Sequence, residues 1–218
     1  MKAAFLPTFL LELALLSWRI SAAPVPANEV CTLDGYQFKC QNGVWPRDKD
    51  MTFPAVTDQT TALHFEKFTF HEENLRPLPA VNLTNLGILT FDNVTVWNSA
   101  GKSVGLPLQQ LTQRLNRVSV TTLRITDTEV GVLDASYFTG FRGLLSLSIK
   151  YCTVESVTPD AFQPLRLEGG GSVLTELQFS ANKGVKTFPW DAIVPVAPSI
   201  RVSILPSQNH YPKYGDNR

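Results

Sequence analysis

The chain has 218 residues with 19 basic and 19 acidic side chains, so its formal net charge is zero, and 44% of its residues are hydrophobic. This balance lacks the basic excess on which nucleic-acid binding depends, which makes nucleic acid an unsuitable partner. The length and the apolar fraction suffice for one domain with a sizeable buried core.

The first predicted element is a secretory signal peptide over residues 1–22. Lys2 precedes an apolar run over 3–18, and small residues suitable for cleavage follow at 21–23. A membrane anchor is the alternative, but Glu12 in the middle of the run would be costly in hydrocarbon. We therefore expect a secreted, extracellular chain with no integral membrane segment after signal removal. Its partner could still hold it at the cell surface.

Residues 23–60 are expected to form an N-terminal cap. Cys31 and Cys40 stand close together directly after the signal peptide, and in an oxidising compartment they most simply pair with each other. Cys152 lies far from both in sequence. We interpret it as a buried free thiol, with a disulfide to an unseen partner or a reactive site as the alternatives.

Self-similarity at a spacing of 24 residues dominates the region 61–204. The repeated positions of one unit are Val120, Leu123, Ile125, Thr128, Val130, Leu133, Phe138 and Phe141, and those of the next are Leu144, Leu147, Ile149, Cys152, Val154, Val157, Phe162 and Leu165. Partial copies begin at Leu63, Leu86 and Leu174. This is the leucine-rich pattern, in which a short strand is followed by a return along the convex side. It predicts an α/β solenoid, a curved array with parallel strands on its concave face and irregular or short helical returns, followed by a polar tail at 205–218.

One position in each leucine-rich unit holds a side chain that turns inward to bond the backbone of the adjacent loop. Thr128, Cys152 and Asn182 occupy it, whereas Phe68 and Val94 stand there in the first two units. A regular polar ladder is therefore predicted only in the later units.

The next copy begins at Leu174, 30 residues after Leu144 instead of 24, and the six extra residues fall in Leu165–Ser172. We expect an insertion loop there. A glycine-rich phosphate cradle is the alternative, but the motif lacks the strand, helix and Gly-Lys-Ser/Thr context that such a cradle needs.

Aromatic and aliphatic residues concentrate in the N-terminal third and admit two interpretations. They could be the plug that covers the first repeat's open core, or they could line an apolar pocket between cap and strands where acyl chains insert. The candidate pocket residues are Tyr36, Phe38, Val44, Trp45, Phe53, Phe65, Phe68, Phe70, Leu75 and Leu78. A basic rim suited to phosphates or carboxylates would comprise Lys39, Arg47, Lys49, Lys67 and Arg76.

Polar motifs on the surface suggest glycosylation and no catalysis. Asn82 and Asn93 each begin an Asn-X-Thr sequon. A metal cluster could be imagined among His64, Glu66, His71, Glu72 and Glu73, but the period-two alternation favours a solvated strand face, so we expect no metal and no cofactor. No Ser or Cys lies in a nucleophile motif, and we expect no enzyme.

Three segments resemble the monocyte differentiation antigen family of myeloid lipopolysaccharide co-receptors: CTLDGYQFKC (Cys31–Cys40), NVTVW (Asn93–Trp97) with LQQL (Leu108–Leu111), and LTELQFSANKGV (Leu174–Val185). The resemblance implies a pattern-recognition protein of innate immunity and the inflammatory response. Such a protein takes microbial lipid into an N-terminal pocket and presents it to a Toll-like receptor complex. Family members have a further cap cysteine where this chain has Asn42 and continue through more repeats, so this chain would be a short or truncated relative.

The alternative to lipid recognition is a different functional class that the repeat also allows. An extracellular protein-interaction or matrix protein would use the concave strand face and would have no lipid pocket. The outward residues of that face are His64, Glu66, Thr90, Asp92, Arg124, Ser146, Lys150, Glu176 and Gln178.

Overall fold

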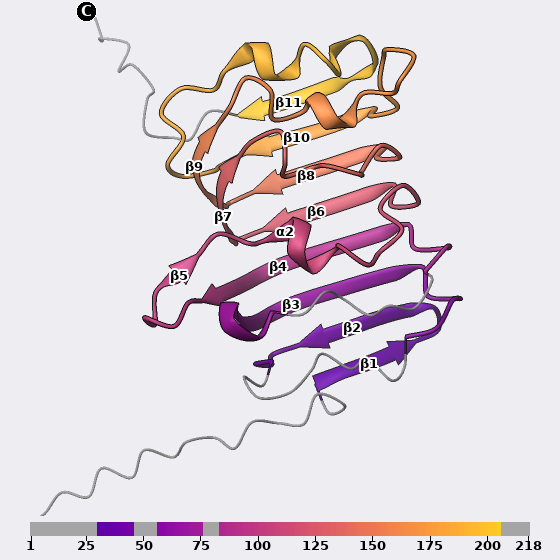
Figure 1. Ribbon diagram of the computed structural model, residues 1–218, viewed down its shortest axis with the longest axis vertical. Coiled ribbons are helices and arrows are strands. Elements are labelled where there is room, and N and C mark those ends of the chain that lie inside the picture. The colour runs from indigo at the N-terminus through magenta and orange to yellow at the C-terminus, as the bar shows by residue number, and fades with distance from the viewer. Residues whose placement is uncertain (1–29, 46–55, 76–82, 206–218) are drawn as a thin grey trace, which may run out of the picture.

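The computed structural model describes residues 30–45, 56–75 and 83–205, and the predicted signal peptide and nearly all of the polar tail lie outside these ranges. The chain is a mostly-β solenoid of about five turns with few helices (Figure 1). The helices of the described residues are short: α2 (Leu108–Leu111) and the 3-10 helices η1 (Glu72–Asn74), η2 (Gln163–Leu165), η3 (Trp190–Ile193) and η4 (Ala197–Ser199). The helical content is therefore smaller than an α/β architecture suggests. Parts of the returns form strands, so the remaining return residues suffice only for turns and very short helices.

Among the described residues, nine strands form the main sheet in the order β1-β2-β3-β4-β6-β8-β10-β11, with β5 attached to β4. Their bounds are β1 (Cys31–Asp34), β2 (Gln37–Gln41), β3 (Ala62–His71), β4 (Ile88–Trp97), β5 (Ser103–Val104), β6 (Thr122–Thr126), β8 (Ser146–Lys150), β10 (Glu176–Ser180) and β11 (Arg201–Leu205). From β2 to β11 each strand pairs in parallel with the next. A second, two-stranded parallel sheet, β7 (Glu129–Leu133) with β9 (Thr153–Val157), belongs to the returns (Figure 1).

The predicted repeat register is present in the strand pairing. Leu123 of β6 stands opposite Leu147 of β8, which stands opposite Leu177 of β10. All the inward positions expected in the two 24-residue units are buried. Because side chains alternate between the faces of a strand, this register gathers the apolar residues on the side that the returns cover.

The polar ladder also forms where the sequence predicts it. Asn182 accepts the backbone N–H of Cys152 at 2.9 Å and donates to the Ile149 carbonyl at 3.0 Å. Thr128 likewise accepts the backbone N–H of Val94 at 3.1 Å. Asn182 thereby satisfies backbone groups at the end of β8, and Thr128 satisfies the N–H of Val94 within β4.

Cys152 is a free thiol in the same ladder, as expected. Its side chain is fully buried, and Sγ donates to the carbonyls of Lys150 at 3.2 Å and Ile125 at 3.4 Å. Burial raises the pKa of this thiol to about 11, which keeps it protonated and unreactive.

In the first two units, backbone groups near the ladder position are paired in a different way. β3 and β4 are each ten residues long and continue past the ladder position, so that Phe68 pairs with Val94 and His71 with Trp97. Backbone pairing replaces the missing polar side chains.

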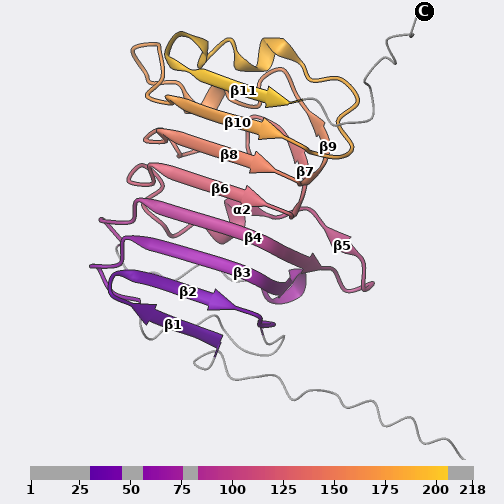
Figure 2. The ribbon, with the colours of Figure 1, turned by 180° about the vertical axis from the view of Figure 1, so that it is seen from behind.

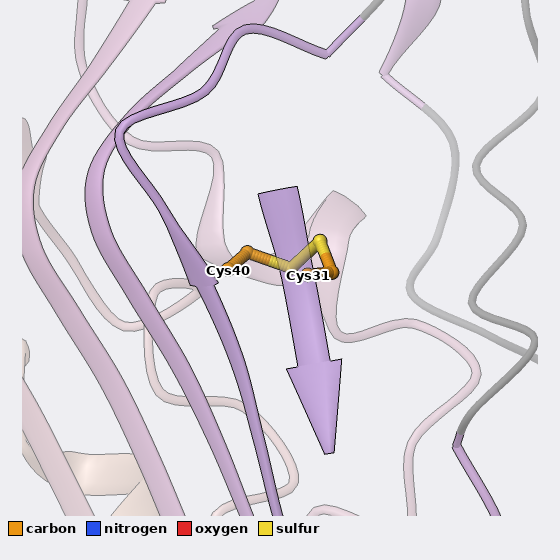
Figure 3. The surroundings of a disulfide bond; sticks show 2 residues. All are labelled: Cys31 and Cys40. Atoms are coloured by element: carbon orange, nitrogen blue, oxygen red, sulfur yellow. A yellow bond between two sulfur atoms is a disulfide. The ribbon is translucent and has the colours of Figure 1, made fainter. Parts of the chain in front are cut away.

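The predicted bridge between Cys31 and Cys40 is present and joins opposite residues of the antiparallel pair β1–β2 (Figure 3). The Cys40 side chain is fully buried. β2 also pairs in parallel with β3, so the cap hairpin extends the solenoid's own sheet. No helix within the described ranges has the length and apolarity needed to cross a bilayer.

Candidate functional site

One face of the main sheet is covered by the returns, and the other carries polar side chains in register. Figure 2 shows this second face with no described element in front of it. Its middle row consists of Lys39, His64, Thr90, Arg124, Ser148 and Gln178, and its end row consists of Gln41, Glu66, Asp92, Thr126, Lys150 and Ser180. We call these two rows, together with Ser146 and Glu176 at the starts of β8 and β10, the polar face. It brings together the outward residues predicted from the sequence.

The N-terminal part of the polar face is held by an ion pair between strands. Lys39 Nζ lies 2.8 Å from Glu66 Oε2, and Gln41 Nε2 donates to the same oxygen at 2.5 Å. The hydrogen bond from Lys39, followed by that from Gln41, lowers the pKa of the Glu66 carboxyl. Glu66 is therefore an anion that its neighbours on β2 already engage.

His64 lies in the middle row between two cations. The pKa of its half-buried imidazole is lowered, first by burial and then by the charges of Lys39 and Arg124. The neutral form consequently predominates at pH 7, and His64 presents one donor and one acceptor to a ligand.

Hydrogen bonds around Glu176 join side chains in the C-terminal part of the polar face. Ser146 Oγ donates to Glu176 Oε2 at 2.9 Å, and Gln178 Nε2 donates to Glu176 Oε1 at 2.5 Å. Arg124 and Lys150 differ, because neither forms an ion pair within the described part of the chain. Their charges are available to a partner.

The predicted pocket residues fall into three groups. Phe38, Trp45, Phe65, Phe68, Phe70 and Leu75 are each at most 3% exposed. Tyr36 and Val44 are instead 60% and 48% exposed. Phe53 and Leu78 lie outside the described residues, as do the rim residues Arg47, Lys49 and Arg76.

Four of the buried members, Trp45, Phe65, Phe68 and Phe70, pack with Phe91 as an aromatic cluster. Phe65 stacks on Phe91 with ring centroids 5.5 Å apart, Phe68 meets Phe70 at 5.1 Å, and Trp45 meets Phe68 at 6.4 Å. These are ordinary spacings for favourable aromatic pairs in a packed interior. A ligand would therefore reach this cluster only by displacing side chains that now touch one another.

A row of threonines is a feature that sequence reasoning missed. Thr61, Thr121 and Thr175 each donate Oγ1 to the carbonyl of the preceding turn, at 3.4, 3.1 and 3.0 Å. Each stands two residues before the first inward residue of its strand, so the recurring Thr-X-Leu spacing was the available signal. The row ties the strand starts together along one edge of the polar face.

The sequon asparagine Asn93 is exposed and has a left-handed backbone, with φ of 51°. Asn tolerates this conformation better than most residues. The other sequon, at Asn82, lies outside the described residues.

Within the ranges 30–45, 56–75 and 83–205, no group of three or more His, Cys, Asp or Glu side chains lies close enough together to hold a metal ion.

No protein-family model matches this sequence, and a search of curated proteins finds no similar one.

Proposed function

We propose that this protein is a secreted, non-catalytic recognition protein built as a curved leucine-rich-repeat array, and that its polar face binds an extracellular partner. The observation that carries the proposal is the continuous register of outward polar side chains from β2 to β10 on a face that no described element covers. Parallel, stacked strands of this kind create the extended binding surfaces of solenoid proteins.

The leucine-rich assignment draws support from the spacing of the strands and from the ladder. Strands β6 and β8 begin 24 residues apart, and Thr128, Cys152 and Asn182 bond the neighbouring backbone. Secretion draws support from the signal-like residues 1–22 and from the Cys31–Cys40 disulfide, since such bonds persist in oxidising compartments. The exposed position of Asn93 suits a glycoprotein.

The chemistry of the polar face favours a folded protein as partner. Its middle and end rows contain both signs of charge and no large apolar side chain. Charged groups arranged in this way provide specificity and steer encounter more than they provide raw affinity. Arg124 and Lys150 are the cations best placed to meet acidic groups of the partner.

The test is a screen of soluble ectodomains with a multimerised form of the chain. We expect true partners to be lost when Arg124→Glu and Lys150→Glu are combined, because charge reversal at an interface costs affinity. The matched control is Arg142→Glu. Arg142 lies outside the polar face, and its guanidinium pairs with the Glu168 carboxylate at a distance of 2.6 Å. Hits that survive the double reversal would assign binding to another surface and overturn the proposal.

Lipid presentation is the second candidate, favoured by the concentration of aromatic side chains around β3 and by the family resemblance. In this alternative, microbial lipid of the lipopolysaccharide type enters the aromatic cluster after its side chains part, with Lys39 and Lys67 beside the headgroup. A Toll-like receptor complex would then receive the lipid.

Lipid A separates the two candidates. Titration of the full chain with lipid A should change the Trp45 fluorescence if lipid enters, and the difference should vanish in Trp45→Phe. Phe68→Asp should abolish binding, whereas Arg124→Glu should leave it intact. If neither lipid A nor dodecanoate binds at micromolar concentration, lipid presentation is to be abandoned and the polar face retained.

A further inference from the structure

The C-terminal returns form an open surface cavity that neither candidate function uses. Its volume is about 850 Å³, and its lining includes Pro159, Asp160, Arg166, Asp191, Val194 and Pro198. Ligand sites commonly occupy roughly 300–1,000 Å³, so this space is large enough for a peptide segment. Figure 1 shows η2, η3 and η4 on the return side of the sheet, opposite the polar face.

The insertion in the unit that begins at Leu144 supplies one wall of this return cavity. Arg166 and Gly171 line it, and both belong to the extra segment Leu165–Ser172. The loop is closed by hydrogen bonds from the Leu167 N–H to the Gly171 carbonyl and from the Gly170 N–H to the Leu167 carbonyl, both 3.0 Å long. The shorter 24-residue unit before it has no such segment.

The opposite wall comes from η3, η4 and the residues between them, and the two walls are tied together. Ser199 Oγ donates to the Ser172 carbonyl at 3.1 Å, and Ser172 Oγ donates to the Leu165 carbonyl at 3.1 Å. Prolines at 159, 195 and 198 stiffen the lining. The cavity therefore exists before any partner arrives, which lowers the cost of binding.

The charges of the lining favour a cation. Asp160 and Asp191 contribute two carboxylates against the single guanidinium of Arg166. Thr158 Oγ1 donates to one oxygen of Asp160 at 2.5 Å, which leaves the second oxygen for a ligand. A basic side chain entering the cavity would restore the local charge balance.

Exposed apolar side chains of η3 and its C-terminal neighbour indicate that the ligand is part of a protein. Trp190 is 62% exposed and Val194 is 64% exposed. Trp190 is held in place edge-on by Phe188, with ring centroids 5.7 Å apart. Tryptophan is enriched among the residues that dominate binding energy at interfaces, and its ring also attracts cations. The lining carboxylates are exposed at the surface, where a protruding protein loop can reach them.

From these observations we infer that the return cavity is a docking site for a protein loop that presents an arginine or lysine flanked by apolar residues. The apolar flanks contact Val194 and the proline rings, and the basic group contacts Asp160 and Asp191. Together with the polar face, the site would let one chain hold two partners on opposite sides of its sheet.

The experiment uses a defined probe, acetyl-Leu-Arg-Leu-amide, titrated into the ¹⁵N-labelled full chain and followed by nuclear magnetic resonance. We expect saturable shifts of the Trp190 indole N–H and of backbone amides at 160–166 and 190–194, with a dissociation constant on the order of 1 mM. The charge-reversed peptide acetyl-Leu-Glu-Leu-amide should give none. The double variant Asp160→Asn/Asp191→Asn should bind the arginine peptide at least about tenfold more weakly, as expected when charged partners are removed.

The matched control Glu73→Gln/Glu155→Gln removes the same charge from exposed positions outside the lining and should bind the peptide as the wild type does. Arg124→Glu, on the polar face, should also leave peptide binding unchanged, so failure here is separable from failure of the polar-face proposal. Equal shifts with both peptides, shifts that survive the double Asn substitution, or no shifts with the arginine peptide would each overturn the docking site.

Discussion

In the turns built on β6, β8 and β10, each strand of the main sheet stops after five residues, and a polar ladder residue bonds the backbone of the preceding turn. In the turns built on β3 and β4, the strands run for ten residues and aromatic or aliphatic side chains occupy the ladder position. Both arrangements meet the demand that buried N–H and C=O groups be paired. In the five-residue strands the inward ladder position holds a small polar side chain, whereas in the ten-residue strands it holds an aromatic or aliphatic one.

The neighbouring cap adapts to the aromatic arrangement. A Cβ added at Gly43 would lie 2.9 Å from Cε2 of Phe68 and 3.0 Å from Cβ of Val30. Gly43 occupies the ladder position of the cap and leaves room for the ring of the next turn. The N-terminal turns therefore depend on close packing, and the C-terminal turns depend on hydrogen bonds.

The largest expected effect is that of Phe68→Ala. Phe68 is 1% exposed and contacts Trp45, Phe65 and Phe70. Truncation should lower the free energy of unfolding by about 3–5 kcal/mol, through lost burial and the cavity left behind. Urea denaturation measures this change, and Phe68→Leu should lose less. A loss below about 1 kcal/mol would mean that the aromatic cluster is loosely packed, which would favour the lipid alternative.

Asn182→Leu should have the next largest effect. The substitution keeps a buried side chain of similar branched shape, somewhat larger in volume, but leaves the Cys152 N–H and the Ile149 carbonyl without their side-chain partner. We expect a loss of about 2–4 kcal/mol, since each unpaired buried group costs about 1–3 kcal/mol. Thr128→Val, which removes a smaller polar group from the same ladder, serves as the milder comparison. Unchanged stability in Asn182→Leu would show that the C-terminal turns rely on packing as well, and the contrast between the two regions would disappear.

Gly43→Ala tests the fit between the cap and the first turn. The added methyl must push against Phe68 and Val30, and we expect a loss of about 1–3 kcal/mol from overpacking. Gly169→Ala is the control, because a Cβ there meets nothing within 4 Å, and its effect should stay within about 0.5 kcal/mol. If both substitutions behave alike in urea denaturation, the cap is not packed tightly against Phe68.

The repeat, its register and its ladder could be predicted from the sequence because they follow from spacing alone. Apolar residues at positions 123, 147 and 177 leave one way to stack the strands that buries all three, and a one-residue slip would expose the whole set. The pairing of Cys31 with Cys40 followed similarly from their proximity and from the odd number of cysteines.

Other features were decided by contacts between segments far apart in the chain. The extension of β3 and β4 past Phe68 and Val94 depends on each strand finding the other's backbone. The return cavity depends on Ser199 reaching the Ser172 carbonyl across 27 residues. The close packing of Phe38, Trp45 and Phe70 depends on how the cap and β3 are placed against each other.

The sequence by itself thus determined which side chains face inward, because strand alternation and a constant repeat length are local, periodic properties. Only the tertiary structure decided how the N-terminal apolar residues pack and where the C-terminal returns leave space. Shape complementarity between distant segments is a property of the assembled chain and leaves no period in the sequence.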